Sequence, residues 1–351
     1  MQMTATQRGI LALVVGIAVF SLQDVILKRL SGDYPLYQAM IIRSLTAVPL
    51  LLIIVRVLDG RLTTITTPNW ALMLARGLLN FVAYTAYYLG LAAMPMADTV
   101  ALFFTAPLFI TIAAALVFKE RIGPLNLLAL AAGFAGMLMI FNPSASVFDP
   151  AALLPVLGAF GYALTQLATR VLGRTETAGA MTFWGNLTFL ASALALAAVF
   201  GSGAYDGAAH PSLAFLTRGW QEMPLRDLLL FMACGLIASI GLSLLTYAYR
   251  VAPSSSVAPF EYSFIIWGVL WGWLFWAQLP SSLAWGGIAL LIGAIIALAR
   301  MAQSSEFTIL RTGGLGPGRA LLLLGGVGVA AAMCVVALGE WVAPWTEQAL
   351  T

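Results

Sequence analysis

The sequence contains very little charge. Only 9% of its 351 residues are Asp, Glu, Lys or Arg, whereas 61% are hydrophobic, and an ordinary soluble domain carries about 25% charged residues. Apolar stretches of about 20 residues, the length that crosses the hydrocarbon core of a bilayer as a helix, recur along the whole chain. They leave no room for a soluble domain between them. The composition therefore predicts an all-α polytopic membrane protein.

Residues that hold metals or carry out covalent chemistry are also scarce. The chain has one histidine, His210, and two cysteines, Cys234 and Cys334, which lie inside apolar stretches without a second ligand nearby. There is no HExxH motif and no G-x-x-x-x-G-K-[ST] loop, because the only lysines are Lys28 and Lys119. We therefore predict no metal, no cofactor and no nucleic-acid partner. The sequence therefore lacks the usual motifs of an intramembrane enzyme and of an ATP-driven pump.

Eleven membrane-spanning helices are predicted, over residues 9–28, 36–56, 70–91, 96–117, 123–141, 151–172, 178–200, 227–249, 254–276, 282–300 and 319–339. We expect the first helix to stay in the protein, since no small-residue cleavage site follows it. The loop 201–226 contains His210, which we expect to be solvated.

The distribution of basic residues predicts the orientation. With the N-terminus in the cytoplasm, eleven basic residues lie inside and four lie outside, while Arg43 and Arg76 fall within spans. The inner set is Arg8, Arg56, Arg61, Lys119, Arg121, Arg170, Arg174, Arg250, Arg300, Arg311 and Arg319, and the outer set is Lys28, Arg29, Arg218 and Arg226. This satisfies the positive-inside rule. We predict a plasma (cell inner) membrane protein whose C-terminus is external if the eleventh helix spans.

The second half of the chain repeats the first. VFSLQDVILKRL, which begins at residue 19, aligns with GYALTQLATRVL, and this alignment places Asp24 on Gln166. LARGLLN, which begins at residue 74, aligns with MACGLIA from residue 232. A third alignment places Phe103 on Glu261.

Each half holds five predicted spans. Because five is odd, equivalent helices cross the membrane in opposite directions, and such inverted-topology repeats are typical of carriers. The predicted domains are therefore a first five-helix repeat over 1–143 and a second over 144–302. A linker and an extra helix occupy 303–351.

Four of the charged residues within predicted spans are candidates for a site, because an unpaired charge inside the membrane costs several kcal/mol. Glu261 in VAPFEYSFIIWGVLWGW and Arg43 lie near the membrane midplane at about 1.5 Å of rise per residue, so we expect them to lie within reach of one another. Asp24 lies nearer the outer surface. Arg76 lies nearer the cytoplasm. Instead of facing a cavity, its side chain could extend to the membrane surface. All four are candidate substrate-binding or coupling residues.

Further candidates are polar or aromatic. Arg76, Asn80, Tyr84 and Tyr87 or Tyr88 recur at helical spacing and predict a face toward a hydrated cavity. The alternative for each residue is hydrogen bonding between helices. The remaining candidates are Trp184, Asn186, Gln166 and Tyr262. Trp267 and Trp271 offer flat surfaces to a planar or cationic substrate, or simply pack.

Taken together, these features resemble the drug/metabolite transporter superfamily, specifically its ten-helix EamA-type members. The resemblance covers about residues 8–300 and rests on the repeat, FSLQDVILKRLSGDYPLYQAMIIRS, MPMADTVALFFTAPLF followed by FKERI, and the VAPFEYS helix. It implies secondary active transport of small metabolites by alternating access, without ATP hydrolysis. The matches of APFEY and IIRS imply that Glu261 and Arg43 lie in the central cavity. The helix after residue 318 lies outside the resemblance.

Glu261 has three alternative roles. In the first role, Glu261 is an acid in a low-dielectric cavity and exchanges a proton whose movement is coupled to transport. In the second role, it binds an amine group of the substrate. The third role is a purely structural ion pair with Arg43. For the whole chain, the alternatives are an intramembrane enzyme, a channel or a receptor, although a channel and a receptor do not require a symmetric duplication.

Overall fold

The computed structural model describes residues 3–30, 32–94, 96–119, 130–132, 134–136, 139, 150–276, 285–290 and 293. All regular secondary structure in these residues is helical, and the elements are α1 (Ala5–Leu30), α2 (Leu36–Leu58), η1 (Leu62–Ile65), α3 (Trp70–Ala93), α4 (Met96–Phe103), α5 (Ala106–Phe118), η3 (Pro150–Ala152), α7 (Leu153–Leu172), α8 (Ala178–Phe200), α9 (Pro211–Thr217), α10 (Leu225–Val251), α11 (Ser254–Val257), η4 (Ala258–Ser263) and α12 (Phe264–Trp276). Most of the spans predicted at 123–141 and 282–300, and all of 319–339, lie outside the described residues.

Five helices in the described part of the chain are long and apolar enough to cross a membrane. They are α1, α2, α7 together with η3, α8 and α10. Helix α3 has 24 residues and is long enough, but it is not one of the five because it carries the polar stripe predicted from the sequence. The protein is therefore an all-helical, multi-pass membrane protein.

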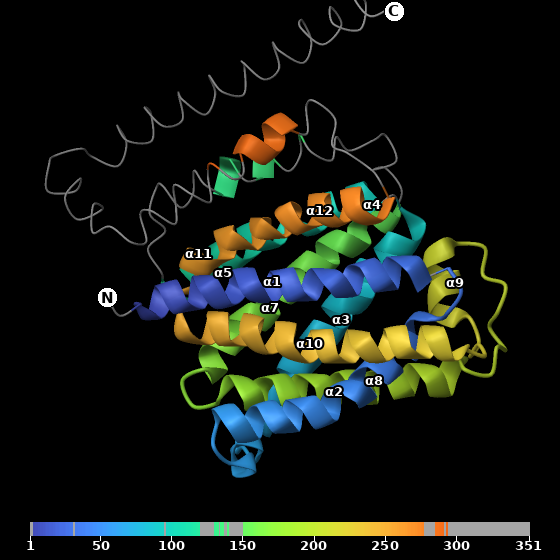
Figure 1. Ribbon diagram of the computed structural model, residues 1–351, viewed down its shortest axis with the longest axis horizontal. Helices are drawn as coiled ribbons and strands as arrows, with labels where there is room; N and C mark the ends of the chain where they lie inside the picture. The colour runs from blue at the N-terminus through green and yellow to red at the C-terminus, as the bar shows by residue number, and fades with distance from the viewer. Residues whose placement is uncertain are drawn as a thin grey trace, which may run out of the picture. The chain divides into compact units, whose positions relative to one another are not determined.

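The chain forms two compact units, and the first comprises residues 1–120 and 143–264. In this unit α10 packs between α1 and α2, and α3 packs between α7 and α8 (Figure 1). Contacts of α2 with α8, of α5 with α7 and η4, and of η4 with α1 join these two rows. The helices of the first unit therefore form a closed ring.

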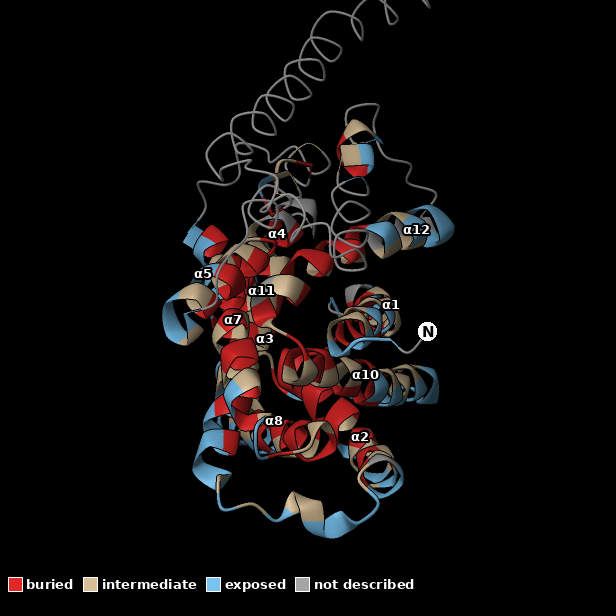
Figure 2. Cartoon of the chain, turned by 90° about the vertical axis from the view of Figure 1, so that its left-hand side faces the viewer, coloured by how far each residue is buried: buried red, intermediate tan, exposed pale blue. Residues whose placement is uncertain are grey.

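The distribution of buried residues matches this ring of helices. In the first unit, buried residues lie where helices face one another, and exposed residues lie on the outer sides (Figure 2). Many exposed side chains of the long helices are large and apolar, including Leu11, Leu45, Ile53, Leu78, Leu157, Leu194 and Leu236. An apolar outer face on helices of this length is the surface that contacts lipid tails.

Two predicted spans are interrupted. The predicted span 96–117 is divided into α4 and α5, and the predicted span 254–276 is divided into α11, η4 and α12. Pro107 lies in the first turn of α5, and Pro259 lies at the start of η4. Proline has no N–H to donate to the preceding turn, so the hydrogen-bond ladder of the helix breaks there.

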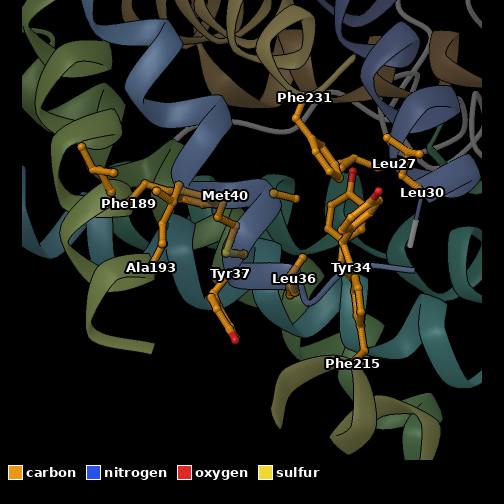
Figure 3. Close-up of a cluster of buried hydrophobic side chains, with 14 residues drawn as sticks. Leu27, Leu30, Tyr34, Leu36, Tyr37, Met40, Phe189, Ala193, Phe215 and Phe231 are labelled. Carbon is orange, nitrogen blue, oxygen red and sulfur yellow. The ribbon is translucent and has the colours of Figure 1, made fainter. Parts of the chain in front are cut away.

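An aromatic cluster closes the end of the first unit that carries α9 (Figure 3). We call this the α9 end. Tyr34, in the connection between α1 and α2, packs edge-on against Phe231 of α10 with 5.5 Å between ring centroids. The hydroxyl of Tyr34 donates to Asp227 at 2.6 Å. Phe215 of α9 belongs to the same cluster. The connections at this end are therefore anchored to the helix bundle.

The loop 201–226 is more ordered than expected. Tyr37 donates from its hydroxyl to the carbonyl oxygen of Arg218 at 2.7 Å. His210 is not simply a solvated loop residue, because its Nδ1 accepts a hydrogen bond from the backbone N–H of Ser212 and caps α9. The sequence around Pro211 begins a helix because proline is well suited to the first helical position.

Close glycine contacts bring the helices together. A Cβ atom added to Gly235 of α10 would overlap the Thr46 side chain and the carbonyl oxygen of Arg43 in α2. A Cβ added to Gly77 of α3 would lie 2.6 Å from the Cβ of Thr188 in α8. Small residues of this kind allow membrane helices to approach closely.

The substitution Gly235→Ala is expected to destabilise the protein by about 1–3 kcal/mol, the usual cost of overpacking. The readout is the thermal unfolding temperature of the purified protein in detergent. Gly32→Ala is the matched control, because nothing lies within 4 Å of an added Cβ there. Equal unfolding temperatures for both variants would contradict the close contact between α2 and α10.

Candidate functional site

A cavity of about 130 Å³ lies inside the ring of the first unit. Its wall is mostly aromatic and aliphatic, and it contains three charged side chains, Asp24 of α1, Arg43 of α2 and Glu261 of η4. We call this the central cavity. Asn80 and Tyr84 of α3 also line it, so five of the residues predicted from the sequence lie around one space.

Glu261 is held by two tyrosines from different helices. Its Oε1 accepts hydrogen bonds from the hydroxyl of Tyr162 in α7 at 2.9 Å and from the hydroxyl of Tyr249 in α10 at 2.7 Å. Hydrogen bonds to a carboxylate are among the stronger ones in proteins. The carboxylate of Glu261 therefore links η4, α7 and α10.

We expected Glu261 and Arg43 to lie within reach of one another, but in the described structure each has other partners. The guanidinium carbon of Arg43 lies 4.8 Å from the ring centroid of Tyr84 and 4.6 Å from that of Phe189. Both distances are within the range of cation–π attraction. The tyrosine hydroxyls, which are neutral donors, take the place beside Glu261 that the sequence suggested for an arginine.

Arg43 has unused hydrogen-bonding capacity. Its side chain is 2% exposed, and within the described part of the protein its Nε and Nη1 atoms have no hydrogen-bond partner. A buried guanidinium group without acceptors is costly in a low-dielectric interior. Such a group therefore has a strong tendency to bind an acceptor that enters the cavity.

Asp24 is bound by a tyrosine as well. Its Oδ1 accepts a hydrogen bond from the hydroxyl of Tyr88 in α3. Tyr84, one turn earlier on α3, accepts from Nε2 of Gln23 at 3.2 Å. The stripe on α3 thus faces α1 and the central cavity, as its helical spacing predicted. Both carboxylates of the cavity therefore accept hydrogen bonds from tyrosine hydroxyl groups.

A smaller and more polar cavity of about 30 Å³ adjoins the central one, since Arg43, Asn80 and Tyr162 line both. Gln166 of α7 and Asn186 of α8 lie in its wall. Nδ2 of Asn186 donates to the carbonyl oxygen of Ser44 at 3.0 Å. Oε1 of Gln166 has no partner within the described part of the protein.

Arg76 lines the smaller cavity but does not extend to the membrane surface. Its guanidinium group is buried and donates to Oγ1 of Thr169 at 2.7 Å, to the carbonyl oxygen of Met181 at 3.0 Å and to Oγ1 of Thr246 at 3.1 Å. These acceptors belong to α7, α8 and α10. Threonine and carbonyl oxygens satisfy the charge inside the bundle, so the longer path to water is not needed.

Two predicted site residues line neither cavity. Trp184 donates from Nε1 to the carbonyl oxygen of Ile65 at 2.9 Å and packs against the cluster around Met73. Tyr262 is 1% exposed, and its ring centroid lies 5.7 Å from that of Phe104. The indole and phenol rings of these residues are used in packing.

Some other residues named from the sequence also lie elsewhere. Trp267 and Trp271 belong to the second unit, where their rings stack on each other with 6.2 Å between centroids. The side chain of Lys28 is outside the described part of the structure. Cys234 is a buried free thiol, and no group of three or more metal-ligating side chains occurs within the described ranges.

Sequence reasoning did not identify the tyrosines that hold Glu261. A signal was present in the repeat, where Glu261 aligns with Phe103 and Tyr162 aligns with Phe20. Glu261 and Tyr162 are both polar, and the residues equivalent to them in the first half are both phenylalanine. A joint change of this kind indicates contact. Tyr249 has no comparable signal, because its equivalent in the repeat is leucine.

A ring of membrane-spanning helices that encloses polar and charged side chains defines a multi-pass membrane protein with an internal binding cavity. A search of solved structures supports the fold. One crystal structure superposes with a TM-score of 0.66 and 17% identity, over 84% of this chain and 98% of the other.

Curated relatives of this chain are transporters. A riboflavin transporter of Rhizobium johnstonii is 35% identical over 66% of this chain and 71% of the relative. A pseudopaline exporter of Pseudomonas aeruginosa is 27% identical over 83% and 96%. An S-adenosylmethionine uptake transporter of Rickettsia bellii is 24% identical over 66% and 74%.

The EamA-like transporter family model matches residues 7–142, and the chain belongs to this family of the drug/metabolite transporter superfamily. It is a membrane transporter of small metabolites, and not an enzyme. A second family model, the lipopolysaccharide export system permease LptF/LptG, matches residues 287–351. Nearly all of that segment lies outside the described residues.

Tyr162→Phe is expected to destabilise the protein by about 1.5–3 kcal/mol, because it removes a hydrogen bond to a charged group. The same substitution in a Glu261→Gln background should cost clearly less, since the charged acceptor is gone. Thermal unfolding of the four proteins in detergent provides this double-mutant cycle. Tyr205→Phe is the control, as Tyr205 is exposed. Identical costs in both backgrounds would contradict the interaction.

Proposed function

We propose that this transporter moves its substrate through the central cavity by alternating access. The observation that carries the proposal is the enclosure of Asp24, Arg43 and Glu261 within one ring of apolar helices. Charged groups inside a membrane protein are costly and mark substrate or ion pathways. Alternating access requires two halves that exchange conformations around such a site.

Contacts between α1 and α10, and between α7 and α3, support two inverted repeats. The alignment that lays Asp24 over Gln166 lays Gly16 over Gly158, and the alignment of Gly77 with Gly235 lays Ala83 over Gly241. A Cβ added to Gly16 would lie 3.1 Å from the carbonyl oxygen of Gly241. A Cβ added to Gly158 would lie 2.9 Å from the carbonyl oxygen of Ala83. Equivalent residues thus make equivalent contacts.

The glycine–threonine contacts follow the same relation. Gly77 of α3 packs against Thr188 of α8, and Gly235 of α10 packs against Thr46 of α2. The alignments lay Gly77 over Gly235 and Thr46 over Thr188. Each threonine hydroxyl donates to the carbonyl oxygen four residues earlier. On this basis we propose repeats over 1–143 and 144–302, and an extra helix in 303–351.

We place the N-terminus in the cytoplasm and the protein in the cell inner membrane. In this orientation Arg56, Arg170, Arg174 and Arg250 lie on the cytoplasmic side, as the positive-inside rule requires. The α9 end, which carries Arg218, then faces outward.

The wall of the central cavity suits a planar substrate. Phe20, Tyr84, Tyr87, Phe103 and Tyr162 present aromatic rings to it, and such rings stack on flat heterocycles. Riboflavin is flat, and three relatives are named riboflavin transporters. We propose a flat heterocyclic metabolite as the substrate, with Arg43 as the donor to its oxygen atoms.

Glu261 is the proposed proton-coupling group. It lies at the central cavity, and both of its described partners are hydroxyl groups that remain neutral. A carboxylate with neutral partners in a low-dielectric site can gain and release a proton as access to water changes. Direct binding of a substrate amine is the competing role.

The test is counterflow of labelled riboflavin into proteoliposomes that contain unlabelled riboflavin. A carrier should show saturable exchange without an ion gradient. Flux that rises linearly without saturation would indicate a channel instead. Absence of exchange with riboflavin, together with exchange of another metabolite, would contradict the proposed substrate but not the carrier.

Glu261→Gln is expected to retain counterflow but to lose accumulation driven by a pH gradient, because an amide does not carry the coupling proton. Glu222→Gln is the control, since Glu222 is an exposed acid. Uphill transport by Glu261→Gln with unchanged pH dependence would rule out the coupling role. Loss of counterflow as well would assign Glu261 to substrate binding.

A further inference from the structure

A third cavity, strongly basic, lies at the end of the first unit opposite α9. It has a volume of about 370 Å³ and is lined by Phe118 at the end of α5, Arg170 and Gly173 at the end of α7, Arg174, and Arg250 at the end of α10. We call it the arginine cavity. It shares no residue with the central cavity or with the smaller cavity beside it.

The guanidinium groups of this cavity retain most of their donors. Nη1 of Arg170 donates to the carbonyl oxygen of Arg250 at 3.0 Å, and Nε of Arg250 donates to the carbonyl oxygen of Glu176 at 2.7 Å. Each guanidinium carries five N–H donors, so these bonds use a minor share. Arg174 is exposed.

Arginine supplies all the charged side chains among the described residues of the arginine cavity. No acidic residue is among the described residues that line it. The neighbouring carboxylate, that of Glu176, points to other groups, and its Oε1 accepts hydrogen bonds from Thr67 at 2.6 Å and Asn69 at 2.7 Å. Among the described residues, three guanidinium groups therefore line one concave space whose lining contains no acidic side chain.

Lipid-facing side chains lie next to the cavity. Leu116 and Val117, in the last turn of α5 before Phe118, are 76% and 61% exposed, and Val171, next to Arg170 on α7, is 41% exposed. Residues of this kind contact acyl chains where a helix faces the bilayer. The arginine cavity therefore lies where a helix surface for lipid tails meets a cluster of cations.

We propose that the arginine cavity binds a phosphate group, carried by an anionic phospholipid or by a free phosphate compound. Arginine forks match phosphate oxygens with paired, charge-assisted hydrogen bonds. Basic pockets between membrane helices on the cytoplasmic side bind phospholipid headgroups. The adjoining apolar surface favours the lipid as the source.

The experiment measures thermal unfolding of the detergent-purified protein during titration with phosphatidylglycerol, with phosphatidylcholine or with inorganic phosphate. The variants are Arg174→Gln and Arg174→Lys. Arg61→Gln is the control, because it removes one exposed positive charge at a different place. Arg174 is exposed, and no side-chain hydrogen bond joins it to another described residue, so its variants should fold.

Phosphatidylglycerol should raise the unfolding temperature of the wild type and of Arg61→Gln more than phosphatidylcholine does. Arg174→Gln should weaken the apparent affinity by about tenfold, the loss of one charge-assisted contact, and Arg174→Lys should weaken it less. Stabilisation by inorganic phosphate with the same dependence on Arg174 would identify a free phosphate compound as the source. Equal responses of Arg174→Gln and Arg61→Gln to every additive would overturn the proposal.

Discussion

Inside a bilayer, a polar group that has left water needs a partner within the protein, because the hydrocarbon offers none. The described helices of this transporter meet that constraint with hydroxyl groups. Tyr162 and Tyr249 bind Glu261, Tyr88 binds Asp24, and two threonines with a carbonyl oxygen bind Arg76. Since the partners lie on different helices, the same bonds that satisfy each charge also fix which helices are neighbours.

This arrangement separates two kinds of buried charge. Arg76 donates three hydrogen bonds to three helices and has the character of a structural clamp. Arg43 is as deeply buried, but it rests against two aromatic rings and leaves its Nε and Nη1 atoms without acceptors among the described residues. We propose that this difference distinguishes a residue that holds the bundle from one that binds substrate. The unsatisfied donors of Arg43 cost free energy that an incoming acceptor recovers.

Much of the fold could be predicted from the sequence, because apolar runs and helix length report directly on the membrane. The spans expected at 36–56, 151–172 and 178–200 match helices within a few residues. The interruptions near Pro107 and Pro259 were harder to foresee. A proline in a membrane helix can be accommodated by a bend, and only the surrounding packing decides that the helix breaks instead.

The candidate site was predicted in part. Depth along a helix placed Arg43 and Glu261 at one level, and both line the central cavity together with Asp24, but depth does not specify rotation about the helix axis. For that reason the sequence paired Glu261 with Arg43 and missed the tyrosines. Trp184 illustrates the same limit, since its indole turns toward the carbonyl of Ile65 rather than toward a cavity.

The most direct test of this account compares Arg43→Gln with Arg76→Gln, with thermal unfolding and riboflavin counterflow measured on the same preparations. Arg76→Gln should lower the unfolding temperature, because Thr169, Thr246 and the carbonyl oxygen of Met181 lose their donor. Arg43→Gln should lower the unfolding temperature less, because within the described part of the protein Nε and Nη1 of Arg43 have no hydrogen-bond partner to lose, while substrate exchange is lost. An Arg43→Gln protein that is as destabilised as Arg76→Gln, yet still exchanges substrate, would contradict the account.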